Sequence, residues 1–146
     1  MLTKLSNKVV SDIALFVIRL ILGVVFIAHG YPKLFVWGVS GVSQFFSQLG
    51  IPFPGFFAVV VSIVEFFGGI ALILGLFSRW AGLLIAIDMI GAILFAKLKV
   101  GLIAPFDKPG VGFELDLALL GCALAILVFG PGRVSVELGL LKKELS

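Results

Sequence analysis

The stretch Phe16-Val-Ile-Arg-Leu-Ile-Leu-Gly-Val-Val-Phe-Ile-Ala-His-Gly30 decides the fold because it places one guanidinium, Arg19, inside an otherwise apolar helix. An arginine at bilayer depth costs at least about 2.5 kcal/mol on insertion scales, and more when it has no partner. Arg19 must therefore face protein, water or a counter-ion. The later apolar segments carry the acids Glu65, Asp88, Glu114 and Asp116. We expect helices folded around a structural ion cluster of Arg19, Glu65 and Asp88.

Composition places the chain in a bilayer. Of its 146 residues, 61% are hydrophobic and only 13% are charged, which is more apolar surface than a soluble domain of this size can bury. The single cysteine, Cys122, cannot form an intrachain disulfide, so the chain has no intrinsic dithiol redox centre. The net charge of +3 comes from cations scattered over short loops and chain ends, which does not indicate nucleic-acid binding.

Hydrophobic runs predict an all-α membrane protein, a bundle of four transmembrane helices forming one membrane domain over residues 1–146. The predicted spans are 12–29, 55–77, 80–96 and 113–129. Each is close to the roughly 20 residues that cross a bilayer core. Gly30 and Pro32 should end the first span, because proline cannot continue the helical hydrogen-bond ladder. We expect the first helix to pack on the second and fourth through Arg19, Gly23, Phe26 and Gly30.

The segments outside the spans predict a topology. Apolar residues at spacings of three and four indicate a short interfacial helix at about 42–49, between the first two spans. The tail from Arg133 to Ser146 is amphipathic and should lie on the surface. Four spans place both termini on one side. That side would hold Lys4, Lys8, Arg79, Arg133, Lys142 and Lys143, against Lys33, Lys97, Lys99 and Lys108 on the other. This bias predicts a multi-pass protein of the cell membrane with both termini in the cytoplasm.

Two groups of polar side chains are candidates for function. Arg19, Glu65 and Asp88 lie near the middle of their spans, whereas His29, Lys33 and Glu114 should gather at the outer mouth. Small residues follow Glu114 at helical spacing, so Glu114 should face a close helix contact, and Asp116 should face solvent or headgroups.

Each candidate also has a purely structural interpretation. Arg19 and Glu65 could form a buried ion pair that only holds helices together. His29 would then interact with a helix dipole, and Lys33 would be a snorkelling anchor.

Several motifs together resemble the DoxX family of small four-helix membrane proteins. They are Arg19-Leu-x-x-Gly, His29-Gly-x-x-Lys-Leu-Phe35, Val64-Glu-x-x-Gly-Gly69, Leu74-Gly-Leu76 with Arg79, and Gly130-Pro-Gly-Arg-Val-Ser135. The resemblance implies links with quinone-linked membrane oxidoreductases, with oxidative and quinone stress, and with membrane chaperones or adaptors. The family's characteristic positions fall on Arg19, His29, Lys33, Glu65 and Glu114, whereas Asp88 and Asp116 lie outside the pattern.

The residues limit the chemistry. One histidine excludes bis-histidine haem, and one cysteine excludes an iron–sulfur cluster. No metal site is expected. A quinone fits best, with Arg19 or His29 donating to a carbonyl oxygen and a carboxylate exchanging the proton. The ligand-binding candidates are Arg19, His29, Glu65 and Glu114, and Glu65 and His29 are the catalytic candidates.

Three functions remain. The first is a quinone-binding subunit of a membrane oxidoreductase system, which predicts a closed apolar cavity meeting Arg19, His29 and Glu65. The second is a non-catalytic adaptor or assembly factor, which predicts a filled interior and an exposed groove. The third is a proton-coupled transporter of small molecules, which needs a water path on both sides of the cluster. The sequence leaves open whether the chain is itself an enzyme or an accessory subunit. Besides the lipid bilayer, its expected partners are further copies of itself or other membrane subunits.

Overall fold

The computed structural model describes residues 2–107 and 109–145, and all of its regular structure is helical. Five α-helices and two short π-helices follow one another along the chain. They are α1 (Leu2–Phe35), α2 (Gly38–Gln48), α3 (Pro54–Leu74), α4 (Ser78–Gly91), η1 (Ala92–Lys97), α5 (Glu114–Phe129) and η2 (Val136–Leu140). The predicted all-α class is confirmed.

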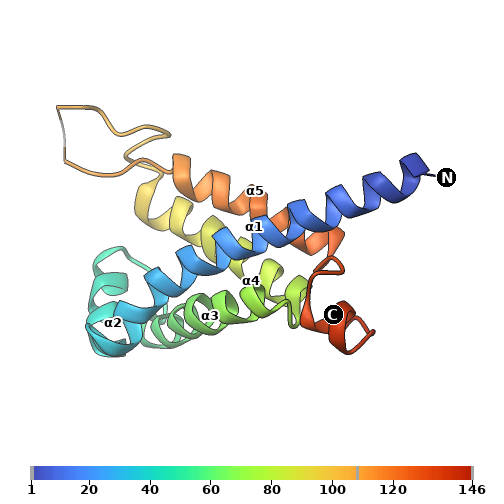
Figure 1. Ribbon diagram of the computed structural model, residues 1–146. Coiled ribbons are helices and arrows are strands. Elements are labelled where there is room, and N and C mark those ends of the chain that lie inside the picture. Colours follow the sequence, from blue (N-terminus) through green and yellow to red (C-terminus); the bar gives the residue numbers. More distant parts are fainter. Residues whose placement is uncertain (1, 108, 146) are drawn as a thin grey trace.

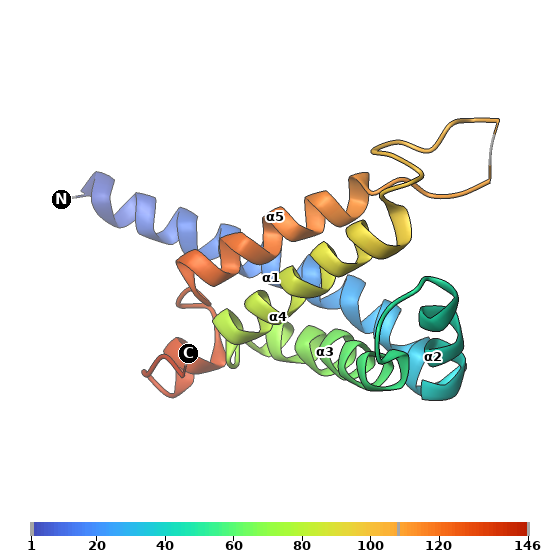
Figure 2. The ribbon, with the colours of Figure 1, turned by 180° about the vertical axis from the view of Figure 1, so that it is seen from behind.

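Four long helices run back and forth between two ends of the molecule. The two chain ends and the α3–α4 turn lie at one end, and α2 with the 98–113 loop lies at the other (Figures 1 and 2). Helix α1 packs mainly on α3, and α4 packs mainly on α5, while α3 joins the two pairs. We call the end with both termini the terminal end and the opposite end the loop end.

Helix α1 does not stop where the sequence indicated. The expected end at Gly30 and Pro32 is wrong, because α1 continues through Pro32 to Phe35. A proline removes only one N–H from the ladder, and the carbonyl of Pro32 still accepts from the N–H of Val36 at 3.1 Å. The extra turn carries Lys33 beyond the predicted span while keeping it on the helix.

Close backbone contact holds α1 against α3. A Cβ at Gly23 would lie 2.6 Å from the carbonyl oxygen of Gly69, and a Cβ at Gly69 would lie 2.7 Å from that of Gly23. Only glycine permits this approach, as in other small-residue contacts between membrane helices. The expected packing face of α1 is confirmed, since Arg19, Gly23, Phe26 and Gly30 are all buried and α1 contacts both α3 and α5.

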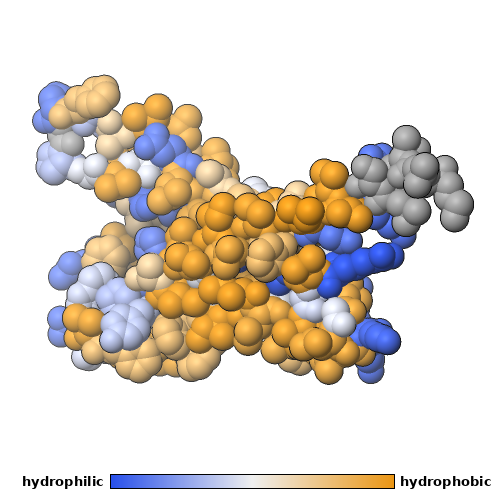
Figure 3. Space-filling model, in the orientation of Figure 1, coloured by the Kyte–Doolittle hydropathy of each residue, from blue (hydrophilic) through white to orange (hydrophobic). Residues whose placement is uncertain are grey.

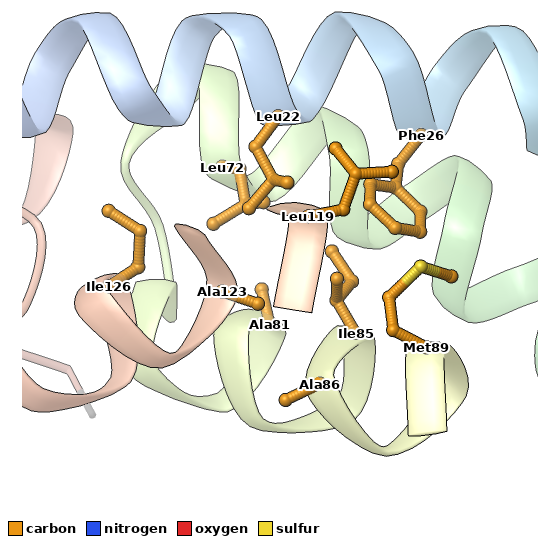
Figure 4. Close-up of a cluster of buried hydrophobic side chains, with 10 residues drawn as sticks. All are labelled: Leu22, Phe26, Leu72, Ala81, Ile85, Ala86, Met89, Leu119, Ala123 and Ile126. Carbon is orange, nitrogen blue, oxygen red and sulfur yellow. The ribbon is translucent and has the colours of Figure 1, made fainter. Parts of the chain in front are cut away.

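The centre of the bundle is filled by apolar side chains. Leu22 and Phe26 point from α1 toward side chains of the other three long helices (Figure 4). Leu72 comes from α3, and Ile85 from α4, and both are fully buried. This core occupies the space between the two ends of the bundle.

Hydrophobic side chains also cover the outside. They form a broad band across the middle of the face in Figure 3, and hydrophilic residues gather toward the ends. Among the described residues, three helical stretches are long and apolar enough to cross a membrane, namely Asn7–Phe35, Pro54–Leu74 and Ser78–Lys97. Helix α5 is shorter, with 16 residues.

Candidate functional site

Arg19 is fully buried, but its partners are backbone carbonyls and not Glu65. One guanidinium nitrogen donates to the carbonyl of Leu72 at 2.9 Å, and the other terminal nitrogen donates to the carbonyl of Val134. Leu72 lies in the last turn of α3, whose carbonyls carry the negative end of the helix dipole. The expected Arg19–Glu65 pair is therefore wrong. Arg19 and Glu65 lie at different levels of the bundle, because Glu65 comes seven residues, about 10 Å, before Leu72 in α3.

Glu137 is the acid whose charge acts on Arg19, and sequence reasoning missed it. Its side chain is fully buried, and its carboxylate accepts from the N–H of Ser78 and of Leu145, each at 3.0 Å. Ser78 begins α4, so the carboxylate lies at the positive end of that helix dipole. The tail does not lie wholly on the surface as expected. The signal was the Gly130-Pro-Gly motif, which turns the chain back toward the helix ends.

Arg79 and Asp12 each contact the tail at the terminal end, and Arg79 also contacts the last turn of α5. Arg79 donates to the carbonyls of Leu127 and Val128 at 2.6 and 2.7 Å, and forms an ion pair with Glu144 at 2.5 Å. Asp12 of α1 accepts from the N–H of Arg133 at 3.0 Å. We call this assembly the terminal closure; its principal charged residues are Arg19, Arg79, Glu137 and Glu144.

Glu65 takes part in a different assembly, further along α3 toward the loop end. Its carboxylate forms an ion pair with Lys33, which reaches it from the last turn of α1. The Glu65 side chain is 5% exposed and that of Lys33 is 17% exposed. The carboxylate is thus enclosed, whereas the ammonium group remains within reach of the surface.

Asp88 extends this assembly from α3 to α4. Its carboxyl group lies close enough to Glu65, Lys33 and Asp116 to interact with their charges, and its buried Oδ2 has no hydrogen-bond partner in the described part of the chain. The expected grouping of Glu65 with Asp88 therefore forms, but Lys33 takes the place predicted for Arg19.

A second ion pair joins α5 to the end of η1. The ammonium of Lys97 lies 2.6 Å from Oδ2 of Asp116, with side-chain exposures of 27% and 8%. The expectation that Asp116 faces solvent or headgroups is wrong, because it shares the buried face of α5 with Leu119 and Ala123. Lys97 is the last residue of η1. The wider π-helical turns point its side chain in a different direction from the one it would have in a continuous α-helix.

These residues form one site, which we call the charged cluster. Its members come from five different helical segments, α1, α3, α4, η1 and α5, and are in that order Lys33, Glu65, Asp88, Lys97 and Asp116. The lysines lie nearer the surface and the carboxyl groups lie deeper. No three His, Cys, Asp or Glu side chains within residues 2–107 and 109–145 are placed to hold a metal ion together.

Two other predicted site residues lie outside the charged cluster. His29 is exposed on α1, and its Nδ1 lies 2.8 Å from the carbonyl oxygen of Val25. Glu114 is exposed at the first residue of α5, so its expected close helix contact is wrong. The buried stripe of α5 is instead the one that includes Asp116.

Two hollows in the described part of the chain are open and apolar. One, of about 220 Å³, lies between α3 and α4 and is lined by Phe67, Phe77 and Trp80 among others. The other, of about 260 Å³, lies between α1 and α5 beside Leu15 and Phe129. Neither is lined by Arg19, His29 or Glu65, so the closed cavity expected around these three residues is not among them.

Comparison with known proteins identifies the family. The DoxX family profile matches residues 14–98 of the chain. Over 112 residues, 75% of this chain and 81% of the relative, the sequence is 37% identical to the "Putative oxidoreductase CatD" of Bacillus subtilis. It is 36% identical over 134 residues to the "Uncharacterized membrane protein Rv3486" of Mycobacterium tuberculosis, covering 86% and 80% of the two chains. It is 29% identical over 138 residues to the "Inner membrane protein YqjF" of Escherichia coli, covering 93% and 98%. No solved structure matches the chain. The chain is a membrane protein that belongs to the DoxX family.

Proposed function

We propose that this DoxX protein is a membrane subunit of a quinone-linked oxidoreductase system, with the quinone headgroup engaged at the rim of the charged cluster. The observation that carries the proposal is the ion pair of Lys33 with Glu65, a partly exposed donor beside an enclosed carboxylate in an apolar bundle. The name of the Bacillus relative supports the oxidoreductase class.

The residues present fit a quinone headgroup at Lys33 better than at Arg19. Both terminal nitrogens of Arg19 are already used by carbonyls in the terminal closure, whereas the Lys33 side chain is 17% exposed. Lys33 would donate to a quinone carbonyl oxygen, and Glu65 or Asp88 would exchange a proton with it. The apolar core fills the bundle, so the ring would approach the rim from outside. His29 and Glu114 have no part in this proposed site.

When bound, a quinone supplies the redox chemistry, because it takes up two electrons and two protons to become a quinol. The chain's own residues hold the carbonyl and move protons. The electrons would come from a partner oxidoreductase, so we propose an accessory role within a larger assembly. Association with such a subunit, or with further copies of this chain, is part of the proposal.

Binding of a short-chain ubiquinone analogue to the protein in nanodiscs tests this function. The variant Lys33→Met with Glu65→Gln removes one cation and one anion, and we expect at least about tenfold weaker binding, equivalent to 1.4 kcal/mol. The control variant Lys99→Met with Asp107→Asn makes the same charge change on exposed loop residues. Equal affinity of the two variants would reject the proposed site.

A non-catalytic adaptor is the second candidate. It is favoured by the filled interior and by the open apolar groove between α3 and α4 that contains Phe67 and Trp80. An adaptor would retain its partner after the charged-cluster substitutions and would bind no quinone in any form. The same interior fills the space that a transporter needs for a water path beyond the charged cluster. Transport therefore has the least support of the three functions.

The membrane placement belongs to the same proposal. We propose that α5 is the fourth crossing, although its 16 residues span only about 24 Å. Helix α2 would lie at the interface at the loop end, since Val42 and Phe46 are buried against the bundle while Gln44 and Gln48 are exposed. Both termini would face the cytoplasm.

A further inference from the structure

The charged cluster contains more acid than base. Glu65 is paired with Lys33, and Asp116 is paired with Lys97, which leaves the Asp88 carboxyl group as the additional acid. Its Oδ2 is buried and has no hydrogen-bond partner among the residues that the structure describes. An ionised carboxylate with an unpartnered buried oxygen is costly in a low-dielectric surrounding, and the group takes up a proton instead.

Among the residues that the structure describes, Lys33 is the cation close to Asp88. The charged groups near it are Lys33 from α1, Glu65 from α3 and Asp116 from α5, and the last of these already holds Lys97 of η1. Helix α2 has no charged residue, and the other charged residue of α4 is Arg79, which belongs to the terminal closure. The two lysines are thus shared among three carboxyl groups.

We infer that the charged cluster is a proton-binding site, in which the Asp88 carboxyl group carries one exchangeable proton beside the Glu65 carboxylate. A protonated Asp88 donates its O–H to the Glu65 carboxylate, and the cluster then has no net charge. Loading forms one O–H bond on a carboxylate, and unloading returns the proton to water or to a bound acceptor. Asp116 and Lys97 continue the site toward the surface, since the Lys97 side chain is 27% exposed.

This inference goes beyond the proposed function, because the proton is present whether or not a quinone binds. The inference also gives the cluster a role in a membrane, which is to exchange a proton with a reaction or partner at its rim. Loss of this proton leaves the site with one net negative charge, so release is favoured when another positive charge takes its place. The site would thus couple protonation to any reaction or partner at its rim.

Infrared spectroscopy of the full chain in liposomes tests the inference without any quinone. At neutral pH the wild type should show a C=O stretching band of a protonated carboxyl group that shifts on exchange into D2O. Asp88→Asn leaves two acids and two lysines, and should abolish the band. Asp88→Glu keeps the carboxyl group and should retain it. The control Asp107→Asn, on an exposed loop residue, should leave the band unchanged.

Variants that change the number of acids relative to lysines should change the size of the band in proportion to the excess of acids. Lys33→Met leaves three acids and one lysine, so the band should increase about twofold. The Lys33→Met, Glu65→Gln double variant keeps one acid in excess and should retain a band of wild-type size, even if quinone binding is lost. Absence of the band in the wild type, or its persistence in Asp88→Asn, would overturn the inference.

Discussion

Buried charges near the α3–α4 turn are stabilised by the helix ends that they face. Arg19 lies at the carbonyl end of α3, and Glu137 lies at the N–H end of α4. Each charge is therefore opposite in sign to the dipole end beside it. This arrangement allows an arginine within an apolar span without an ion pair from a neighbouring span.

Replacing Glu137 tests whether its buried carboxylate stabilises the N-terminal end of α4. Glu137→Gln keeps the shape but removes the charge and one of the two acceptor oxygens, so unfolding should become easier by about 1 to 3 kcal/mol. The matched change Glu144→Gln affects a partly exposed ion pair, and should cost no more than about 1 kcal/mol. Chemical unfolding in bicelles measures both, and a larger loss in Glu144→Gln would contradict the assignment.

At the scale of helices, the contact between α1 and α3 depends on glycines, which have no side chain to hold the two backbones apart. Gly23 and Gly69 bring the two backbones together, and each would place a Cβ within 3 Å of the other's carbonyl oxygen. Lys33 and Glu65 lie on the same pair of helices. The spacing between α1 and α3 thus contributes to the geometry of the charged cluster.

Gly23→Ala should therefore separate the two helices. We expect a loss of about 1 to 3 kcal/mol, typical of overpacking, despite the better helix propensity of alanine. Gly91→Ala in α4 is the control, because a Cβ there has no neighbour within 4 Å. Unfolding of the two variants under identical conditions compares them, and equal stability would show that the close contact is unimportant.

At the scale of the whole molecule, the apolar runs predicted the all-α class and the three helical stretches that are long enough to cross a membrane. Gly30 and Pro32 did not end α1, because the carbonyl of Pro32 still accepts from the N–H of Val36. The pairing of charges could not be predicted. Pairing depends on how far neighbouring helices are shifted along their axes relative to each other. Arg19 of α1 lies beside Leu72 of α3 and not beside Glu65.

The position of the tail also could not be predicted from the sequence. Its alternating charged and apolar residues indicated a surface segment, because sequence pattern does not reveal which chain end closes a bundle. Glu137 became a buried cap of α4 only because the preceding turn returned the chain to the α3–α4 end. Asp116 was likewise assigned to solvent or headgroups, since its partner Lys97 follows a π-helical segment that the hydrophobic period did not indicate.

The buried charges form two separate assemblies, with Arg19 in the terminal closure and Glu65 in the charged cluster. Double-mutant cycles on the free energy of unfolding in bicelles test it most directly. The Lys33→Met and Glu65→Gln cycle should show a coupling of about 1 kcal/mol or more, because these residues form an ion pair. The Arg19→Gln and Glu65→Gln cycle should be additive within about 0.5 kcal/mol, because the two residues share no partner. A strong coupling of Arg19 with Glu65, together with additivity for Lys33, would contradict the account.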